Sequence, residues 1–140
     1  MKKSVLISLL LVFMMGCSKD GFNNQNPYLP NLSFSMEVNT NFATYNNLTF
    51  PGNSVRVYPV NGPTNGVLVF NTGSGYNAFD GSCPNQVIET CSKLTLSNSN
   101  AQCPCQSENY NLYNGQTTGL PYGLKQYQVQ VNANIITVFN

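Results

Sequence analysis

The sequence predicts an all-β domain, folded as a small antiparallel sandwich or barrel, and three observations support this class. Short apolar segments of strand length recur along the chain, and Gly, Pro and Asn turn signals separate them. Charged residues make up only 8% of the 140 residues, whereas a helical or disordered chain would need more Ala, Glu and Lys. No stretch has a convincing helical period, and no internal repeat is visible. At this length one domain is expected.

The first residues predict a targeting signal. Lys2 and Lys3 precede an apolar run, Val5 to Met15, that is too short to span a bilayer comfortably. The following Met14-Met15-Gly16-Cys17 resembles a bacterial lipobox. This resemblance implies cleavage before Cys17 and acylation of its thiol; ordinary secretion with a chance cysteine is the alternative. Two or three acyl chains would hold the protein firmly at a membrane.

The chain is therefore expected to have three parts: a lipoprotein signal peptide at 1–16, a lipid-anchored flexible tether at 17–30 and a β domain at 31–140. The tether is polar and contains two prolines. The expected location is the bacterial cell envelope, at the outer membrane or the cell surface. A net charge near zero gives no electrostatic reason to expect nucleic acid as a partner.

The first half of the domain predicts four strands. Leu32, Phe34, Met36 and Val38 alternate with polar residues, which is the period of a half-buried strand. Residues 39–53 are expected to form a loop with a brief strand pairing at 48–50. The other three strands are Val55–Tyr58, the continuous apolar and therefore buried run Val67–Phe70, and Tyr76–Phe79 after a hairpin turn.

The second half predicts strands that lie between loops. Asn114-Gly115 is the strongest two-residue hairpin signal in the chain. Residues 98–101 are expected to form a turn, and residues 119–123 a third, rigid loop. The expected strands are Lys93–Leu96, Tyr110–Tyr113, Tyr127–Val131 and Ile135–Phe139.

Four of the five cysteines lie in two further loops, each with a Cys-Pro pair. The first loop contains Cys83-Pro84-Asn85 and the second Cys103-Pro104-Cys105-Gln106. With the spacing between them and the flanks from Val55 to Phe139, these loops resemble the Rieske [2Fe–2S] domain. That family binds its cluster with C-x-H in one loop and C-x-x-H in the other. The resemblance implies a Rieske-like fold with both cysteine loops at one end.

The chain departs from the Rieske pattern at the cluster ligands. It contains no histidine, and Asn85 and Gln106 occupy the positions of the two ligand histidines. A neutral amide is a poor substitute for an imidazole on iron. Glu108 stands where the family usually has a Ser, and its carboxylate would face an anionic cluster. The former ligand positions are thus Cys83, Asn85, Cys103 and Gln106, and neither a cofactor nor a metal ion is expected.

The resemblance also implies how the cysteines pair. In some Rieske proteins each cluster loop carries one additional cysteine and these two form a disulfide; Cys91 and Cys105 resemble that pair. Cys83 and Cys103 match two thiolates of one iron, which would lie roughly 3.8 Å apart on a tetrahedral metal. A small movement would join them. The implied disulfides, Cys91–Cys105 and Cys83–Cys103, would each stabilise the domain by about 3 kcal/mol.

Two metal-binding alternatives remain open at this point. The four cysteines could ligate a [2Fe–2S] cluster in an electron carrier with non-standard ligands, or a zinc ion. In the simplest form of either, Cys83 and Cys103 would hold the metal. Export to an oxidising compartment favours disulfides.

An enzymatic role is not expected. Without histidine, a Ser or Cys nucleophile lacks its commonest base, and the acidic residues show no carboxylate pair. Asp80 and Glu89 flank the first cysteine loop, where loop solvation or turn capping explains them. Residues 120–122 are expected either to form an apolar loop tip that meets a partner or to pack over the disulfides. The predicted role is structural or partner-binding, with the membrane and an unknown envelope protein as partners.

Overall fold

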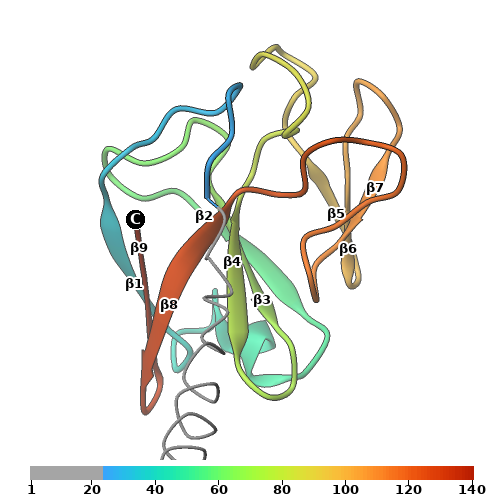
Figure 1. The fold of residues 1–140 in the computed structure, drawn as a ribbon. Helices are drawn as coiled ribbons and strands as arrows, with labels where there is room; N and C mark the ends of the chain where they lie inside the picture. Colours follow the sequence, from blue (N-terminus) through green and yellow to red (C-terminus); the bar gives the residue numbers. More distant parts are fainter. Residues whose placement is uncertain (1–23) are drawn as a thin grey trace, which may run out of the picture.

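The protein, in a computed structural model that describes residues 24–140, has two antiparallel sheets (Figure 1). The larger sheet has the strand order β1-β9-β8-β4-β3-β2 and the smaller one β5-β6-β7. The predicted signal peptide 1–16, Cys17 and the first part of the predicted tether lie outside the described residues. The strands of the larger sheet are β1 (Ser35–Asn39), β2 (Ser54–Val57), β3 (Val67–Asn71), β4 (Tyr76–Asp80), β8 (Gln126–Asn132) and β9 (Ile135–Phe139). Those of the smaller sheet are β5 (Thr95–Ser97), β6 (Asn100–Gln102) and β7 (Asn109–Asn111).

Strand β3 lies between two hydrophobic cores, which explains its continuous apolar sequence. Val67 and Val69 pack into the first core, together with residues of β1, β8 and β9. Leu68 and Phe70 point to the opposite face and pack into the second core, with Cys83 and Cys103 among its members. Because successive side chains of a strand point to opposite faces, a strand between two cores must be apolar at every position.

Strand β1 confirms the predicted alternation. Phe34, Met36 and Val38 are buried in the first core, and the residues between them are exposed or half-buried. β1 pairs with β9, and the ring of Phe34 lies edge-on to that of Tyr127 on β8, with 4.8 Å between centroids. Residues 126–127 of β8 pair with β4, whereas residues 128–132 pair with β9, so β8 curls from one half of the sheet into the other.

Three local predictions are wrong. Residues 46–49 form a short 3-10 helix, η2 (Asn46–Thr49), instead of a strand, because the backbone oxygen of Leu48 accepts hydrogen bonds from the side chains of Asn71 and Tyr76. Residues 100–102 form β6, since the turn after β5 is tighter than expected and uses Asn98 at φ 52°. Asn114 and Gly115 do turn the chain, but the segment after them leads into the third loop and forms no strand before β8.

The segment 24–30, here called the N-terminal strap, differs from the expected flexible tether. Leu29 is only 4% exposed. The side-chain amide of Asn26 donates to the backbone oxygen of Pro84 at 2.8 Å, and the ring of Tyr28 meets that of Tyr122 edge-on. The strap therefore packs against the first cysteine loop and the third loop (Figure 1). Among the described residues, no helix is long and apolar enough to cross a membrane.

Candidate functional site

Two disulfides join the two cysteine loops at one end of the molecule. Cys83 bonds Cys103 and Cys91 bonds Cys105, with Cα atoms 5.5 and 5.2 Å apart. These are the pairs that the resemblance implied. Cys83 and Cys103 are completely buried in the second core, whereas Cys91 is exposed and Cys105 half-buried. We call Cys83–Cys103 the inner disulfide and Cys91–Cys105 the outer disulfide.

Backbone hydrogen bonds hold each loop in shape beside the disulfides. In the first loop, the backbone amide of Cys83 donates to the backbone oxygen of Ser92 at 2.8 Å, and Ser82 forms an isolated antiparallel β-bridge with Lys93. In the second loop, the amide of Ser107 donates to the oxygen of Cys103 at 2.8 Å. Ser107 closes this turn with φ 65°, in the left-handed region that is unfavourable for most residues. The backbone at each cysteine of the inner disulfide is thus held by a hydrogen bond within its own loop.

Asn85, which the Rieske resemblance aligns with the first ligand histidine, connects the first loop to the third loop. Its side-chain amide donates to the hydroxyl of Tyr110 at 3.0 Å and to the backbone oxygen of Tyr122 at 2.7 Å. Its oxygen accepts from the backbone amide of Tyr122 at 3.0 Å. Burial raises the pKa of Tyr110, the hydrogen bond from Asn85 opposes this, and nearby Glu108 adds to it. Every polar group of the Asn85 side chain therefore has a protein partner.

Gln106, which the Rieske resemblance aligns with the second ligand histidine, is placed differently. Its side chain is exposed and forms no hydrogen bond with any of residues 24–140. The two side chains thus differ: that of Asn85 is fully hydrogen-bonded within the fold, and that of Gln106 is exposed.

The residues present do not fit a Rieske [2Fe–2S] cluster. Cluster iron needs thiolate sulfur, and all four cysteine sulfurs are bonded in pairs. Of the two residues that the resemblance places at the histidine positions, Asn85 is fully hydrogen-bonded and Gln106 is exposed. Within the described part of the chain, the Oε2 atom of Glu108 is buried without a hydrogen-bond partner, and this carboxylate lies near enough to Tyr110 to raise its pKa. The sulfurs of Cys83, Cys103 and Cys105 do lie within 4.8 Å of one another.

A buried polar cluster lies directly beneath the first loop. Asp80 accepts from the amide of Ser82 and from the hydroxyl of Tyr127, both at 2.8 Å. The turn-capping role of Asp80 was expected, but the bond to Tyr127 was not, because nothing in the sequence relates β4 to β8. Burial raises the pKa values of Asp80 and Tyr127 and lowers that of Lys125, whose ammonium donates to the backbone oxygen of Pro30 in the strap.

The tips of the first and third loops carry exposed apolar side chains. Val87 is 66% exposed, and Pro121 is exposed as well. Leu120, in contrast, packs against the second core, and Tyr122 is half-buried against Tyr28. Of residues 120–122, two therefore pack inward and only Pro121 is exposed.

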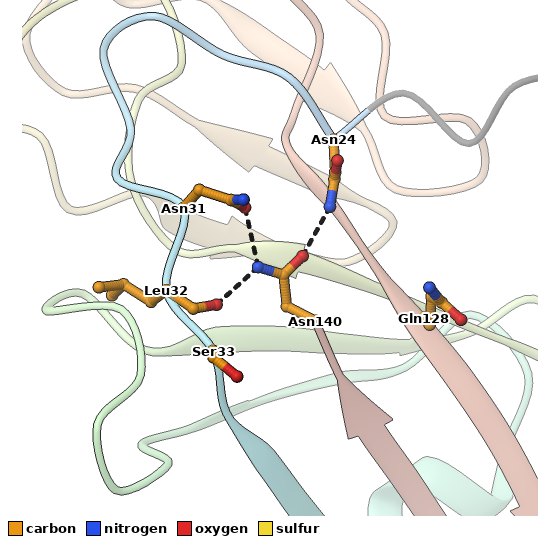
Figure 2. Close-up of a pocket in the computed structure, with 6 residues that line it drawn as sticks. All are labelled: Asn24, Asn31, Leu32, Ser33, Gln128 and Asn140. Carbon is orange, nitrogen blue, oxygen red and sulfur yellow. Dashed lines mark hydrogen bonds between the residues drawn. The ribbon is translucent and has the colours of Figure 1, made fainter.

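A shallow polar hollow lies where the strap, β8 and the last residue meet. Figure 2 shows the side chain of Asn140 at its centre, bonded to Asn24, to Asn31 and to the backbone oxygen of Leu32. These bonds fasten the last residue of the chain to the N-terminal segment. The hollow thus has a structural explanation within the fold.

The comparisons with known proteins support the fold. No protein-family model matches the chain, and no curated protein sequence does. The chain is similar to a solved structure of the complex of reduced oxygenase and oxidized ferredoxin in carbazole 1,9a-dioxygenase. The two are 20% identical, with a TM-score of 0.53, over 76% of this chain and 93% of the other.

A second similar structure is the ferredoxin of carbazole 1,9a-dioxygenase from Nocardioides aromaticivorans IC177. It is 21% identical over 74% of this chain and 96% of that chain, and its TM-score of 0.48 adds nothing to the argument. At such identities the similarity concerns the fold alone. The protein has a Rieske-like all-β fold in which two disulfides join the cysteine loops.

Proposed function

We propose that the protein is a lipid-anchored component of the bacterial envelope whose Rieske-like domain has lost its cluster and binds another envelope protein without catalysing a reaction. The observation that supports this best is the inner disulfide. It uses the two sulfurs that would hold one iron, while the side chain of Asn85 is hydrogen-bonded to the backbone of Tyr122 in the third loop. The loops then keep the shape of a cluster-binding tip without needing the cluster.

Cluster loss is tested on the exported, purified full-length chain. We expect no iron, no acid-labile sulfide and no visible absorption, together with two disulfides by mass mapping. A brown protein with stoichiometric iron would overturn the proposal. It would favour the alternative of an electron carrier with non-standard ligands, for which the closeness of three cysteine sulfurs is the supporting observation.

The lipid anchor is proposed from Cys17 alone. The chain between Cys17 and Asn24 allows a reach of at most about 25 Å, so acylation would keep the domain close to the membrane surface. We expect the wild-type chain to partition into detergent and to incorporate labelled fatty acid, and Cys17→Ser to lose both properties. A Cys17→Ser chain that still carries label would contradict this assignment.

The proposed partner surface is the tip formed by the first and third loops. Asn85 bonds the two loops together, and Val87 and Pro121 are apolar and exposed there. Exposed apolar side chains on rigid loops are typical of protein-binding surfaces.

This surface is tested in the native envelope with a photo-crosslinking residue at Val87. The matched control is Ser74, which is exposed on the β3–β4 turn at the opposite end of the large sheet (Figure 1). We expect a discrete crosslinked product from position 87 that position 74 does not give. The same products from both positions, or none from position 87, would contradict a partner at the loop tip.

A further inference from the structure

Beyond the binding role, we propose that the two disulfides form a thiol–disulfide exchange relay. A dithiol reductant attacks the outer disulfide at Cys91, and the released Cys105 carries the exchange to the buried inner disulfide. The relay rests on three features: the different exposure of the two bonds, the closeness of three sulfurs, and the polar groups around Cys105.

The two disulfides differ in their access to solvent. Cys91 is exposed, whereas Cys83 and Cys103 have no exposed surface. Exchange requires a thiolate to reach a disulfide sulfur directly. In the folded protein an external thiol therefore meets only the outer bond, and the inner bond can react only with a group that is already inside.

Cys105 is such a group. Its sulfur lies within 4.8 Å of the sulfurs of both Cys83 and Cys103, which leaves little more than contact distance between them. Cys105 and Cys103 are on the same short turn, and Cys91 is on the other loop. Once its bond to Cys91 is broken, the Cys105 thiolate needs only a small side-chain rotation to meet the inner disulfide.

The surroundings of Cys105 also favour its release as a thiolate. The side-chain amide of Gln86 donates to the Cys105 sulfur at 2.9 Å, and the hydroxyl of the buried Ser92 lies 4.0 Å from it. Donors that face a sulfur stabilise its thiolate and make it the better leaving group. A reductant that attacks the exposed Cys91 thus expels Cys105 rather than the reverse.

The exchange balances at each step. The reductant thiolate bonds to the Cys91 sulfur and the Cys91–Cys105 bond breaks, so the electron pair leaves on Cys105. The Cys105 thiolate then bonds to Cys83, the Cys83–Cys103 bond breaks, and Cys103 takes up a proton as a thiol. The second thiol of the dithiol attacks the mixed disulfide, which oxidises the reductant to its own disulfide and leaves Cys91 as a thiol. Two electrons have then passed from the dithiol to the domain.

The decisive experiment compares reduction of the inner bond in the wild-type chain and in Cys91→Ser/Cys105→Ser. Both folded full-length chains are treated with dithiothreitol without denaturant, quenched in acid and alkylated, and each thiol is mapped by mass spectrometry. We expect inner thiols to appear about tenfold or more slowly in the double variant, because the internal nucleophile is gone. If the outer disulfide only stabilised the fold, inner thiols would appear faster in the double variant, because the domain would open more often and expose the inner disulfide. An equal or faster rate in a folded double variant would overturn the relay.

A matched pair of single variants tests the relay without any reductant. Cys91→Ser leaves a thiol at Cys105 and Cys105→Ser leaves one at Cys91, and both variants lack the outer bond. In Cys91→Ser, we expect native-state alkylation to label one inner cysteine, because Cys105 has formed a disulfide with the other. In Cys105→Ser, we expect alkylation to label Cys91 alone. Label confined to Cys105 in the first variant, or equal scrambling in both, would overturn the relay even if the double variant fails to fold.

Discussion

Asn85 supports the loop tip from a position that the Rieske resemblance aligns with a metal ligand. An imidazole bound to iron turns toward the cluster, whereas the amide of Asn85 turns toward Tyr110 and the backbone of Tyr122. Three hydrogen bonds from one short side chain fix the distance between the first and third loops. The residue is thus part of the support of the loop tip.

Replacing this amide is expected to loosen that support. Asn85→Ala should lower the free energy of unfolding by about 2 kcal/mol, because the amide and oxygen of Tyr122 lose their partner in a half-buried place. Urea unfolding followed by circular dichroism measures the change. Gln106→Ala is the control, and it should change the value by less than about 0.5 kcal/mol since that side chain is exposed. Equal effects of the two variants would refute the role of Asn85.

Asp80 should make stability depend on pH. Burial raises its pKa above the ordinary value of 3.8, so the folded state holds a proton that the unfolded state has released. Its stabilising effect is complete below 3.8 and is lost as the pH rises through the raised pKa. Relative to wild type, Asp80→Asn should therefore gain stability over this rise. Urea unfolding at a series of pH values measures it, with Glu37→Gln at an exposed position of β1 as the matched control. A constant difference at all pH values would contradict the shift.

The turn of the β8–β9 hairpin contains a locally strained residue, and a glycine at the same position would avoid the strain. Ala133 lies in the turn with φ 51°, in the left-handed region where a Cβ atom is unfavourable. Other turns place glycine at such positions, for example Gly73 between β3 and β4 at φ 90°. The strain is tolerated because β8 and β9 pair over five positions next to the turn.

Ala133→Gly should therefore raise the free energy of unfolding by about 0.5–1 kcal/mol. Its control is Asn132→Gly, one residue earlier in β8, where φ is ordinary and glycine should lower stability by a similar amount. Thermal and urea unfolding of both variants give the comparison. A loss of stability in Ala133→Gly would show that this turn is unstrained in solution.

The N-terminal strap should contribute to stability as a strand would, although it pairs with none. Leu29→Ala should cost about 2 kcal/mol, since Leu29 is 4% exposed and its side chain leaves a cavity. Val60, which is 84% exposed, provides the control Val60→Ala, expected within about 0.5 kcal/mol of wild type. A Leu29→Ala chain as stable as its control would mean that the strap does not hold to the domain in solution.

The two hydrophobic cores differ in what stabilises them. The first is held by side-chain packing against the large sheet, whereas the second, at the cysteine loops, also contains a disulfide. Among residues 24–140, no cysteine belongs to the first core, whereas Cys83 and Cys103 are members of the second. The inner disulfide therefore both crosslinks the loops and fills the core beneath them.

Removing the inner disulfide should accordingly cost more than removing the outer one. The chain-entropy contribution is about 3 kcal/mol for either bond, because the loops that they close are of similar length. Cys83→Ala/Cys103→Ala loses buried core volume in addition, so its urea midpoint should lie below that of Cys91→Ser/Cys105→Ser. The reverse order would contradict the assignment of Cys83 and Cys103 to the core.

Much of the fold was accessible from the residue pattern, because burial imposes a local period. The alternation from Leu32 to Val38 predicted β1, and the unbroken run Val67–Phe70 predicted a strand covered on both faces. Where a partner far away in the chain controls the backbone, the pattern failed. Asn71 and Tyr76 hold the backbone of Leu48 in a 3-10 turn that the local sequence gives no reason to expect.

The same division applies to the candidate site. The resemblance to the Rieske domain implied both disulfide pairs, and the missing histidines implied the loss of two iron ligands, since both inferences depend on residue identity and order. Identity alone could not show that Asn85 is bound and Gln106 exposed, nor that Cys105 lies beside the inner bond. Those facts depend on which loops meet when two sheets close around their cores, and only long-range packing fixes such meetings.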